Sequence, residues 1–285
     1  MTGKVCLITG ATAGIGEAAA RALARMGATV IVAGRDSAKT QGVVDRLRGE
    51  TGNSRIEPIV ADLSIQSEVS RMAREFRSRF PRLDVLLNNA GAYYAKRRES
   101  AEAIEMTFAL NQLAYFLLTH ELLDLLKASE PARIINVSSD AHRGAKLDWL
   151  NIQLRKGYGG FRAYCNSKLA NLYFTFELAR MLERQNAKVT VNAMHPGFVA
   201  SQFGLQTGGA GFRIFRKLAD RLFALTPEQG ASTAVYLASS PEVEGVSGKY
   251  FYKSRAIEPT KTALDANSAR RMWAICEELT RTRWS

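Results

Sequence analysis

The chain has 285 residues, of which 46% are hydrophobic, and this length suits one large α/β domain with a substantial core. Lys and Arg number 39 against 27 Asp and Glu, a formal net charge of +12, but the basic residues are scattered, which argues against nucleic-acid binding as a main function. The cysteines (Cys6, Cys165 and Cys276) are odd in number and lack zinc-site spacing, so we expect no disulfide framework and no bound metal.

The N-terminus and the length of the apolar runs indicate where in the cell the protein is expected. An apolar segment begins after only four residues, which leaves no room for a signal peptide. No uninterrupted apolar run approaches the roughly 18 residues of a membrane helix. We therefore expect a soluble, cytoplasmic protein without a transmembrane segment.

Short runs rich in β-branched residues alternate with longer segments of helical periodicity. This pattern is typical of parallel strands joined by crossover helices, so we predict a single α/β domain built on a doubly wound parallel sheet of about seven strands. The predicted strands are Val5–Thr9, Thr29–Ala33, Ile56–Ala61, Asp84–Asn89, Arg133–Ser138, Val189–Met194 and one near Gly248–Tyr252.

The string TGATAGIGEA directly follows the first predicted strand and opens the first predicted helix. Gly10, Gly14 and Gly16 would let the backbone turn tightly and approach a pyrophosphate, whose charge a helix N-terminus favours. The spacing G-x-x-x-G-x-G differs from the common G-x-G-x-x-G, and such a loop alone could be merely a glycine-rich turn. Its place between a strand and a helix indicates a dinucleotide ligand.

The end of the second predicted strand reads VAGRD and bears on the choice of dinucleotide. Gly34 stands where an acidic residue would accept hydrogen bonds from the ribose 2′-OH of NAD, and Arg35 follows it. A cation there could pair with a 2′-phosphate, so the sequence favours NADP(H). The alternative is that Arg35 is a solvated surface charge and that Asp36 supplies the acid one position later.

The string FRAYCNSKLANLYF places Tyr164 four residues before Lys168 at the start of a long apolar helix. Residues four apart share one helix face, so both side chains would project toward the carboxyl edge of the sheet. A phenol titrates near 10, and a neighbouring ammonium would lower that pKa, which makes Tyr164 a candidate acid and base. The alternative is a buried tyrosine beside a lysine whose ammonium reaches solvent.

Taken together, these strings resemble the classical short-chain dehydrogenases/reductases. TGATAGIG, NNAG, NVSS, YCNSK and HPG occur in the order and spacing of that family over nearly the whole chain, and RIINVSSDAH and AYCNSKLANLYFTFELAR are most similar to the retinol dehydrogenase and protochlorophyllide reductase branch. The resemblance implies a Rossmann-like fold, an NADP(H) cofactor and a small apolar carbonyl or alcohol substrate, or a carbon–carbon double bond in the reductase case. It leaves open a homo-oligomer and a peripheral membrane contact.

The resemblance also divides the chain and assigns its residues. Residues 1–140 would mainly bind the cofactor, and residues 141–285 would carry the catalytic helix, a substrate lid near 198–226 and a C-terminal helix. The catalytic residues would be Asn111, Ser139, Tyr164 and Lys168. The cofactor would be bound by Gly10, Thr12, Ala13, Gly14, Ile15, Gly16, Arg35, Asp62, Leu63, Asn89, Ala90, Gly91, Tyr164, Lys168, Pro196, Gly197, Val199 and Ser201.

In these assigned roles, Ser139 hydrogen-bonds the substrate oxygen and Tyr164 exchanges its proton. Lys168 holds the nicotinamide ribose and lowers the tyrosine pKa. Asn111 would hold a water that continues the proton relay; the alternative is a core asparagine bonded only to backbone. His142 and His195 could suggest a metal or a histidine base, but Tyr164 already fills that role and structural histidines are common.

Two segments depart from the simplest pattern. Ser139 and Tyr164 are separated by 24 residues rather than the dozen of many members, so we expect an extra loop at about 143–161. The segment 202–225 reads as a glycine-rich hinge followed by a basic amphipathic helix, with Phe212 and Phe215 on its apolar side. It would close over the nicotinamide as a lid, lie on an anionic membrane, or simply cover the core.

The sequence therefore predicts an NADP(H)-dependent oxidoreductase that transfers hydride between nicotinamide and an apolar carbonyl or alcohol, such as a retinal-like aldehyde. One alternative is an NADP(H)-sensing or scaffolding protein without turnover, since fold alone never excludes this. The other is a reductase of a carbon–carbon double bond.

Overall fold

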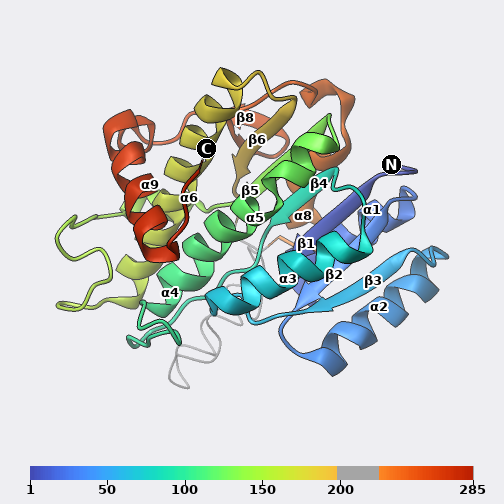
Figure 1. Cartoon of the computed structure of the whole chain (residues 1–285), viewed down its shortest axis with the longest axis horizontal. Coiled ribbons are helices and arrows are strands. Elements are labelled where there is room, and N and C mark those ends of the chain that lie inside the picture. The colour runs from blue at the N-terminus through green and yellow to red at the C-terminus, as the bar shows by residue number, and fades with distance from the viewer. Residues whose placement is uncertain (198–224, 285) are drawn as a thin grey trace.

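In the part of the chain that the structure describes, residues 1–197 and 225–284, an eight-stranded sheet lies between two layers of helices (Figure 1). The structure is a computed structural model. The strand order is β3-β2-β1-β4-β5-β6-β7-β8. Neighbouring strands from β3 to β7 pair in parallel, and only β8 is antiparallel to its neighbour β7.

The elements follow one another as alternating strands and helices. The strands are β1 (Val5–Thr9), β2 (Thr29–Gly34), β3 (Ile56–Val60), β4 (Val85–Asn88), β5 (Ala132–Val137), β6 (Val189–Met194), β7 (Tyr250–Tyr252) and β8 (Arg255–Ile257). The long helices are α1 (Gly14–Arg25), α2 (Ser37–Thr51), α3 (Gln66–Arg79), α5 (Ala114–Ala128), α6 (Gly160–Arg184), α8 (Pro227–Ser239) and α9 (Ala266–Thr280). Short helical segments are α4 (Met106–Phe108), η1 (Ala109–Leu113), η2 (Asp140–Gly144), η3 (Pro241–Val243) and η4 (Lys261–Leu264). The predicted doubly wound parallel sheet is confirmed.

Strand β1 shows why the central strands read as continuous apolar runs. Successive side chains of a strand point to opposite faces of the sheet. Val5 and Leu7 belong to the core cluster that includes α3, α5, α6 and α9, whereas Cys6 and Ile8 belong to the cluster that includes α1, α2 and α8. Both faces of the strand are buried, which explains why Val5, Cys6, Leu7 and Ile8 are all apolar.

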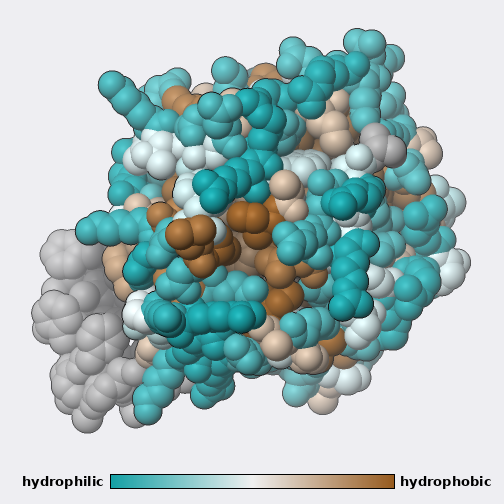
Figure 2. All heavy atoms as spheres, turned by 60° about the vertical axis from the view of Figure 1, so that its left-hand side comes forward, coloured by the Kyte–Doolittle hydropathy of each residue, from teal (hydrophilic) through white to brown (hydrophobic). Residues whose placement is uncertain are grey.

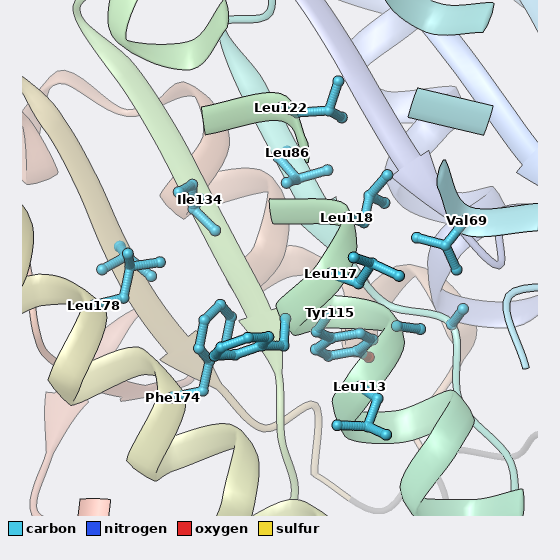
Figure 3. Close-up of a cluster of buried hydrophobic side chains, with 14 of the residues drawn as sticks. Val69, Leu86, Leu113, Tyr115, Leu117, Leu118, Leu122, Ile134, Phe174 and Leu178 are labelled. Carbon is cyan, nitrogen blue, oxygen red and sulfur yellow. The ribbon is translucent and has the colours of Figure 1, made fainter. Parts of the chain in front are cut away.

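Helices α5 and α6 meet over the sheet through large side chains (Figure 3). The ring of Phe116 on α5 lies 5.5 Å from that of Phe174 on α6 and 5.0 Å from that of Trp273 on α9. Each such aromatic pair contributes about 0.5–1.5 kcal/mol beyond its buried area. This packing fixes α6, the helix that carries Tyr164 and Lys168, against the sheet.

The eighth strand was not predicted. The chain turns from β7 into β8 through Lys253 and Ser254, whose φ angles are 48° and 58°. A two-residue hairpin turn with both φ angles positive usually contains Asn or Gly. The Lys-Ser pair therefore gave the sequence no turn signal, and β8 was missed.

One face of the molecule is mostly hydrophilic with an apolar patch near its centre (Figure 2). Among the described residues, the exposed large hydrophobic side chains are Met26, Leu150, Phe161 and Leu264. No helix within residues 1–197 and 225–284 combines the length and the apolar character that crossing a membrane requires.

Candidate active site

The loop between β1 and α1 leaves the first turn of α1 open. Gly14 begins the helix with φ 56°, and no atom lies within 4 Å of the position that a Cβ would take there. Ala13, the N-cap residue, has no side chain that could cap the helix. The unpaired N–H groups of the first turn and the positive end of the helix dipole can therefore receive an anion such as a pyrophosphate.

The end of β4 is hydrogen-bonded to this glycine loop. Asn89 Nδ2 donates to the carbonyl oxygens of Thr9 and Gly10 at 2.8 and 3.2 Å. A Cβ at Gly16 would lie 2.5 Å from Asn89 Nδ2, so only glycine permits this close approach. The structure thus brings the predicted residues Gly10, Gly16, Asn89 and Ala90 together at one point of the sheet edge.

At the end of β2, Gly34 has no room for the acidic side chain that an NAD site needs at this position. A Cβ at Gly34 would lie 2.4 Å from both Thr12 Cγ2 and Thr40 Oγ1. Asp36, the alternative acid, is the N-cap residue of α2 and accepts a hydrogen bond from Lys39 N at 2.8 Å. Arg35 between them is exposed. The carboxylate of Asp36 caps α2, whereas the guanidinium of Arg35 caps no helix.

Asp62 and Leu63 lie at the turn after β3. Asp62 Oδ1 accepts hydrogen bonds from the backbone N and the hydroxyl of Ser64, at 2.9 and 2.7 Å. Leu63 is buried. These bonds give the turn a fixed shape at the same sheet edge as the glycine loop, which is where the predicted adenine contacts would have to lie.

Ser139 and Tyr164 are neighbours at the carboxyl end of β5. Ser139 is the N-cap residue of η2, and its hydroxyl accepts a hydrogen bond from Ala141 N at 3.2 Å. Tyr164, in the first turns of α6, is hydrogen-bonded to Ser139. Burial of its hydroxyl raises the pKa of Tyr164 to about 12, although the bond with Ser139 lowers it in part.

Lys168 is almost fully buried one turn further along α6. Its Nζ donates to Val137 O at 2.8 Å and to Asn171 Oδ1 at 3.3 Å, and it lies 5.8 Å from the ring centroid of Tyr164. Burial lowers the pKa of Lys168 to about 7. Burial dominates the pKa of both groups, so the pKa of Tyr164 is raised in this geometry rather than lowered as expected from the neighbouring lysine.

Asn111 lies in η1, a single π-helical turn, and such turns are frequent at functional sites. Its side chain accepts from Ala92 N at 2.8 Å and donates to Ala92 O and Ser167 Oγ, both at 3.0 Å. These bonds account for its complete burial, and the alternative of backbone partners alone is wrong because Ser167 also takes part. The backbone carbonyl oxygen of Asn111 accepts a hydrogen bond from Asn171 Nδ2 at 2.7 Å.

Three side chains at the site were not expected from the sequence. Asn171 is bonded to Lys168 and to Asn111 O. The ring of Tyr93 meets that of Tyr164 edge-on, with centroids 6.4 Å apart. His142 Nε2 lies 3.4 Å from Thr260 N, which can only donate, so Nδ1 carries the proton and donates to Ser139 O at 2.8 Å. Asn171 and His142 each lie three positions after a predicted site residue, Lys168 and Ser139, so local spacing could have indicated them. Tyr93 comes from a different segment, and no local motif indicated its contact with Tyr164.

The predicted extra loop is present between η2 and α6, where residues 145–159 form neither helix nor strand. Tyr158 Oη donates to Tyr94 O at 2.7 Å, which ties this loop to the segment that follows Gly91. A Cβ at Gly160 would lie 2.4 Å from the same carbonyl oxygen. The first turn of α6 is thus pressed against residues 93–95.

The loop after β6 is described only as far as Gly197. Gly197 has φ 78°, and a Cβ there would lie 2.9 Å from Leu225 Cδ1. The ring of His195 stacks on that of Tyr252, with centroids 4.1 Å apart, so this histidine has a structural contact. Val199, Ser201 and the predicted lid, except Leu225 and Thr226, lie outside the described residues.

Comparisons with known proteins agree with this geometry. The sequence model of the short chain dehydrogenase family matches residues 4–207. The chain is 41% identical to human retinol dehydrogenase 14, covering 97% of this chain and 86% of the relative, and 35% identical to human polyprenol dehydrogenase, covering 97% and 85%. It is similar to the RhlG/NADP active-site complex of Pseudomonas aeruginosa with a TM-score of 0.70 at 28% identity, covering 88% of this chain and 94% of that one. The chain therefore belongs to the short-chain dehydrogenase family, a family of oxidoreductases, in a branch that resembles the retinol dehydrogenases.

Proposed function

We propose that the protein is an NADP(H)-dependent oxidoreductase that transfers hydride between nicotinamide and an apolar carbonyl or alcohol. The observation that carries this proposal is one edge of the sheet with two complementary halves. The open first turn of α1 lies at the end of β1, and Tyr164, Ser139 and Lys168 gather at the end of β5. The first half suits a dinucleotide, and the second suits proton exchange at a substrate oxygen.

The preference for NADP(H) rests on the turn after β2. Gly34 has no space for a side chain, and the carboxylate of Asp36 is engaged in capping α2. Within the described residues, no carboxylate forms an ion pair with Arg35. An exposed guanidinium can pair with a 2′-phosphate through charge-assisted hydrogen bonds, whereas an NAD ribose would lack its acidic partner. The complex of the similar Pseudomonas aeruginosa protein is named for NADP, which agrees with this preference.

The cofactor would be held by the residues that the sequence already named on these loops, with the pyrophosphate at the first turn of α1. When bound, the nicotinamide supplies or accepts the hydride. Tyr164 keeps its proton at neutral pH because its pKa is about 12, so its hydroxyl can donate to a carbonyl oxygen. Ser139 would orient that oxygen, and Lys168 would bind the ribose hydroxyls and stabilise a tyrosinate during proton exchange.

The substrate class follows from similarity and from the aromatic surroundings of Tyr164. Two relatives are named for retinol and polyprenol, which are lipophilic alcohols. Tyr93 presents its ring to Tyr164, which provides an apolar surface beside the reacting hydroxyl. We propose a lipophilic aldehyde, ketone or alcohol. The cytoplasmic location, a homo-oligomer and the division of function between residues 1–140 and 141–285 stay predictions.

The test is a screen of NADPH consumption with apolar aldehydes, ketones and retinoids, together with dissociation constants for NADPH and NADH. We expect turnover, and NADPH binding tighter by about 1–3 kcal/mol, since the pair with Arg35 is charge-assisted. Arg35→Ala should narrow this difference. Arg74→Ala, which removes an exposed arginine on α3, should not.

Two results would contradict the proposal. Equal affinity for both cofactors, or tighter NADH binding, overturns the NADP(H) preference. Binding of NADPH without turnover on any substrate favours the sensor or scaffold alternative, and light-dependent reduction of a pigment double bond favours the reductase alternative.

A further inference from the structure

Asn171 lies one helical turn after Lys168 on α6 and is completely buried. Its Nδ2 donates to Asn111 O at 2.7 Å and to Gln112 Oε1 at 3.0 Å. Its Oδ1 accepts from Lys168 Nζ at 3.3 Å. A buried amide that uses both its ends satisfies the general requirement that buried polar groups be paired.

The chemistry of the partners fixes the orientation of this amide. The carbonyl oxygen of Asn111 can only accept a hydrogen bond, and the ammonium of Lys168 can only donate. The nitrogen of Asn171 must therefore face η1, and its oxygen must face Lys168. Of the side chains with nearly the same shape, aspartate lacks the donor, and leucine lacks both the donor and the acceptor.

The bonds of Asn171 complete a chain of hydrogen bonds that links the loop after β4 with η1, α6 and β5. Ala92 follows Gly91, one of the residues predicted to bind the cofactor, and is bonded through both its backbone groups to the side chain of Asn111. Asn111 O is bonded to Asn171, and Asn171 to Lys168 Nζ, which also donates to Val137 O on β5. The position of the ammonium is thus set by η1 and β5 together.

The surroundings of Lys168 contain no opposing charge. The titratable groups that face it are Tyr164 on α6 and Tyr115 on α5, whose ring centroids each lie 5.8 Å from Nζ. The η1 residues Asn111 and Gln112 are bonded to Asn171, and β5 contributes the carbonyl of Val137 that accepts from Nζ. Among residues 1–197 and 225–284, no carboxylate forms an ion pair with Lys168. Asn171 Oδ1 is therefore the side-chain acceptor on which the ammonium depends.

We propose that Asn171 is a positioning residue for Lys168. It holds the ammonium at a fixed place relative to the π-helical turn at Asn111 and to Gly91, which is predicted to bind the cofactor. This inference rests on the proposed function, in which Lys168 binds ribose and assists Tyr164. Asn171 itself is not a catalytic residue, because it acts through Lys168.

The test uses two substitutions with opposite consequences. Asn171→Asp places a carboxylate beside Lys168 and should raise the pKa of the ammonium, so the alkaline limb of the kcat/KM profile should move upward by about one pH unit or more. Asn171→Leu removes the acceptor, which should lower that pKa and move the limb downward. Thr175→Val is the control: Thr175 is also buried on α6, and its hydroxyl accepts from Asn136 and donates to the backbone carbonyl of Asn171. Among the described residues it forms no hydrogen bond with Lys168.

A second readout keeps the result independent of turnover. The ¹³Cε resonance of Lys168, assigned by its loss in Lys168→Met, reports the lysine pKa in each variant directly. Opposite shifts for the Asp and Leu variants, with no shift for Thr175→Val, support the inference. If both Asn171 variants lose thermal stability but keep the wild-type lysine titration, Asn171 is only structural and the inference fails. A wild type without NADPH turnover would overturn the proposed function alone.

Discussion

Two buried charges lie at opposite ends of the parallel strands and are satisfied very differently. Asp84, just before β4, is 2% exposed and accepts hydrogen bonds from Val5 N, Lys4 Nζ and Arg82. Lys168, beside the carboxyl end of β5, is 4% exposed and donates to two neutral oxygens. One charge has two opposite charges beside it, and the other has none among the described residues.

The pKa values follow from this difference. Burial would raise the pKa of Asp84, but the hydrogen bonds from Arg82, Val5 and Lys4 together hold it below its ordinary value. For Lys168 nothing offsets burial, and its pKa falls to about 7. A buried carboxylate whose pKa is lowered in the folded state stabilises that state at neutral pH. An under-paired charge at the ligand edge of an α/β sheet instead marks a candidate functional group. Substitutions at the two ends should therefore separate stability from activity.

The largest effect is expected at Tyr164, next to the under-paired lysine. Tyr164→Phe removes only a hydroxyl, so the fold and NADPH affinity should persist while turnover falls at least about 10²-fold, as for a lost general acid. Steady-state kinetics, NADPH titration and thermal unfolding measure the three quantities. Tyr93→Phe, which keeps the ring that faces Tyr164, is the matched control and should retain most of the turnover. Near-normal turnover of Tyr164→Phe would refute its role.

Lys168→Met should lower both turnover and NADPH affinity, each by about tenfold or more, because one charge-assisted bond is worth about 1.5–3 kcal/mol. Unlike most core substitutions, it should not lower the free energy of unfolding at pH 7, since it removes a buried charge without an ion partner.

The pKa of Lys168 also predicts how the difference in stability between wild type and Lys168→Met changes with pH. The folded-state pKa of Lys168, about 7, lies below its unfolded value of about 10.4, so the unfolded state binds more protons between these values. Stability of the wild type should therefore gain a rising contribution from about pH 7 to pH 10 that Lys168→Met lacks. Unfolding curves across this range, in denaturant, measure the difference. Parallel pH profiles for the two proteins would show that the lysine is not desolvated.

The sequence predicted the features that depend on local spacing. The glycine loop, the Tyr164 and Lys168 pair, and seven of the strands each follow from residues within a few positions of one another. Gly34 could be identified as the residue in the acidic position, but only the structure shows that Thr12 and Thr40 leave no room for a side chain there.

The features that the sequence missed depend on residues far apart in the chain. Asn171 and the Asn111 carbonyl that it binds are 60 positions apart, and no periodicity links them. The pKa of Tyr164 was predicted in the wrong direction because spacing reveals a neighbouring lysine but not the burial of both groups. Asp84 was assigned to a strand, but its partners Lys4 and Val5 lie 80 and 79 positions earlier, at the start of the neighbouring strand β1.

The smallest effect on activity is expected at the fully paired end. Asp84→Asn keeps the shape of the side chain but removes the charge that Lys4 and Arg82 neutralise, so the free energy of unfolding should fall by about 1–3 kcal/mol. The lower part of this range is expected because the Lys4 and Arg82 side chains are 36% and 42% exposed, and solvent screens their charges. Because the folded-state pKa of Asp84 is lowered, its contribution is complete above the unfolded value of about 3.9 and is lost as the pH falls through the folded value. The difference in the free energy of unfolding between wild type and Asp84→Asn should accordingly be constant near neutral pH and disappear in acid, while turnover and NADPH affinity stay unchanged.

Asp124→Asn, at an exposed position on α5, is the control for removal of a charge, and it should alter neither the free energy of unfolding nor turnover. An Asp84→Asn variant that keeps wild-type stability but loses turnover would reverse the contrast between the two ends.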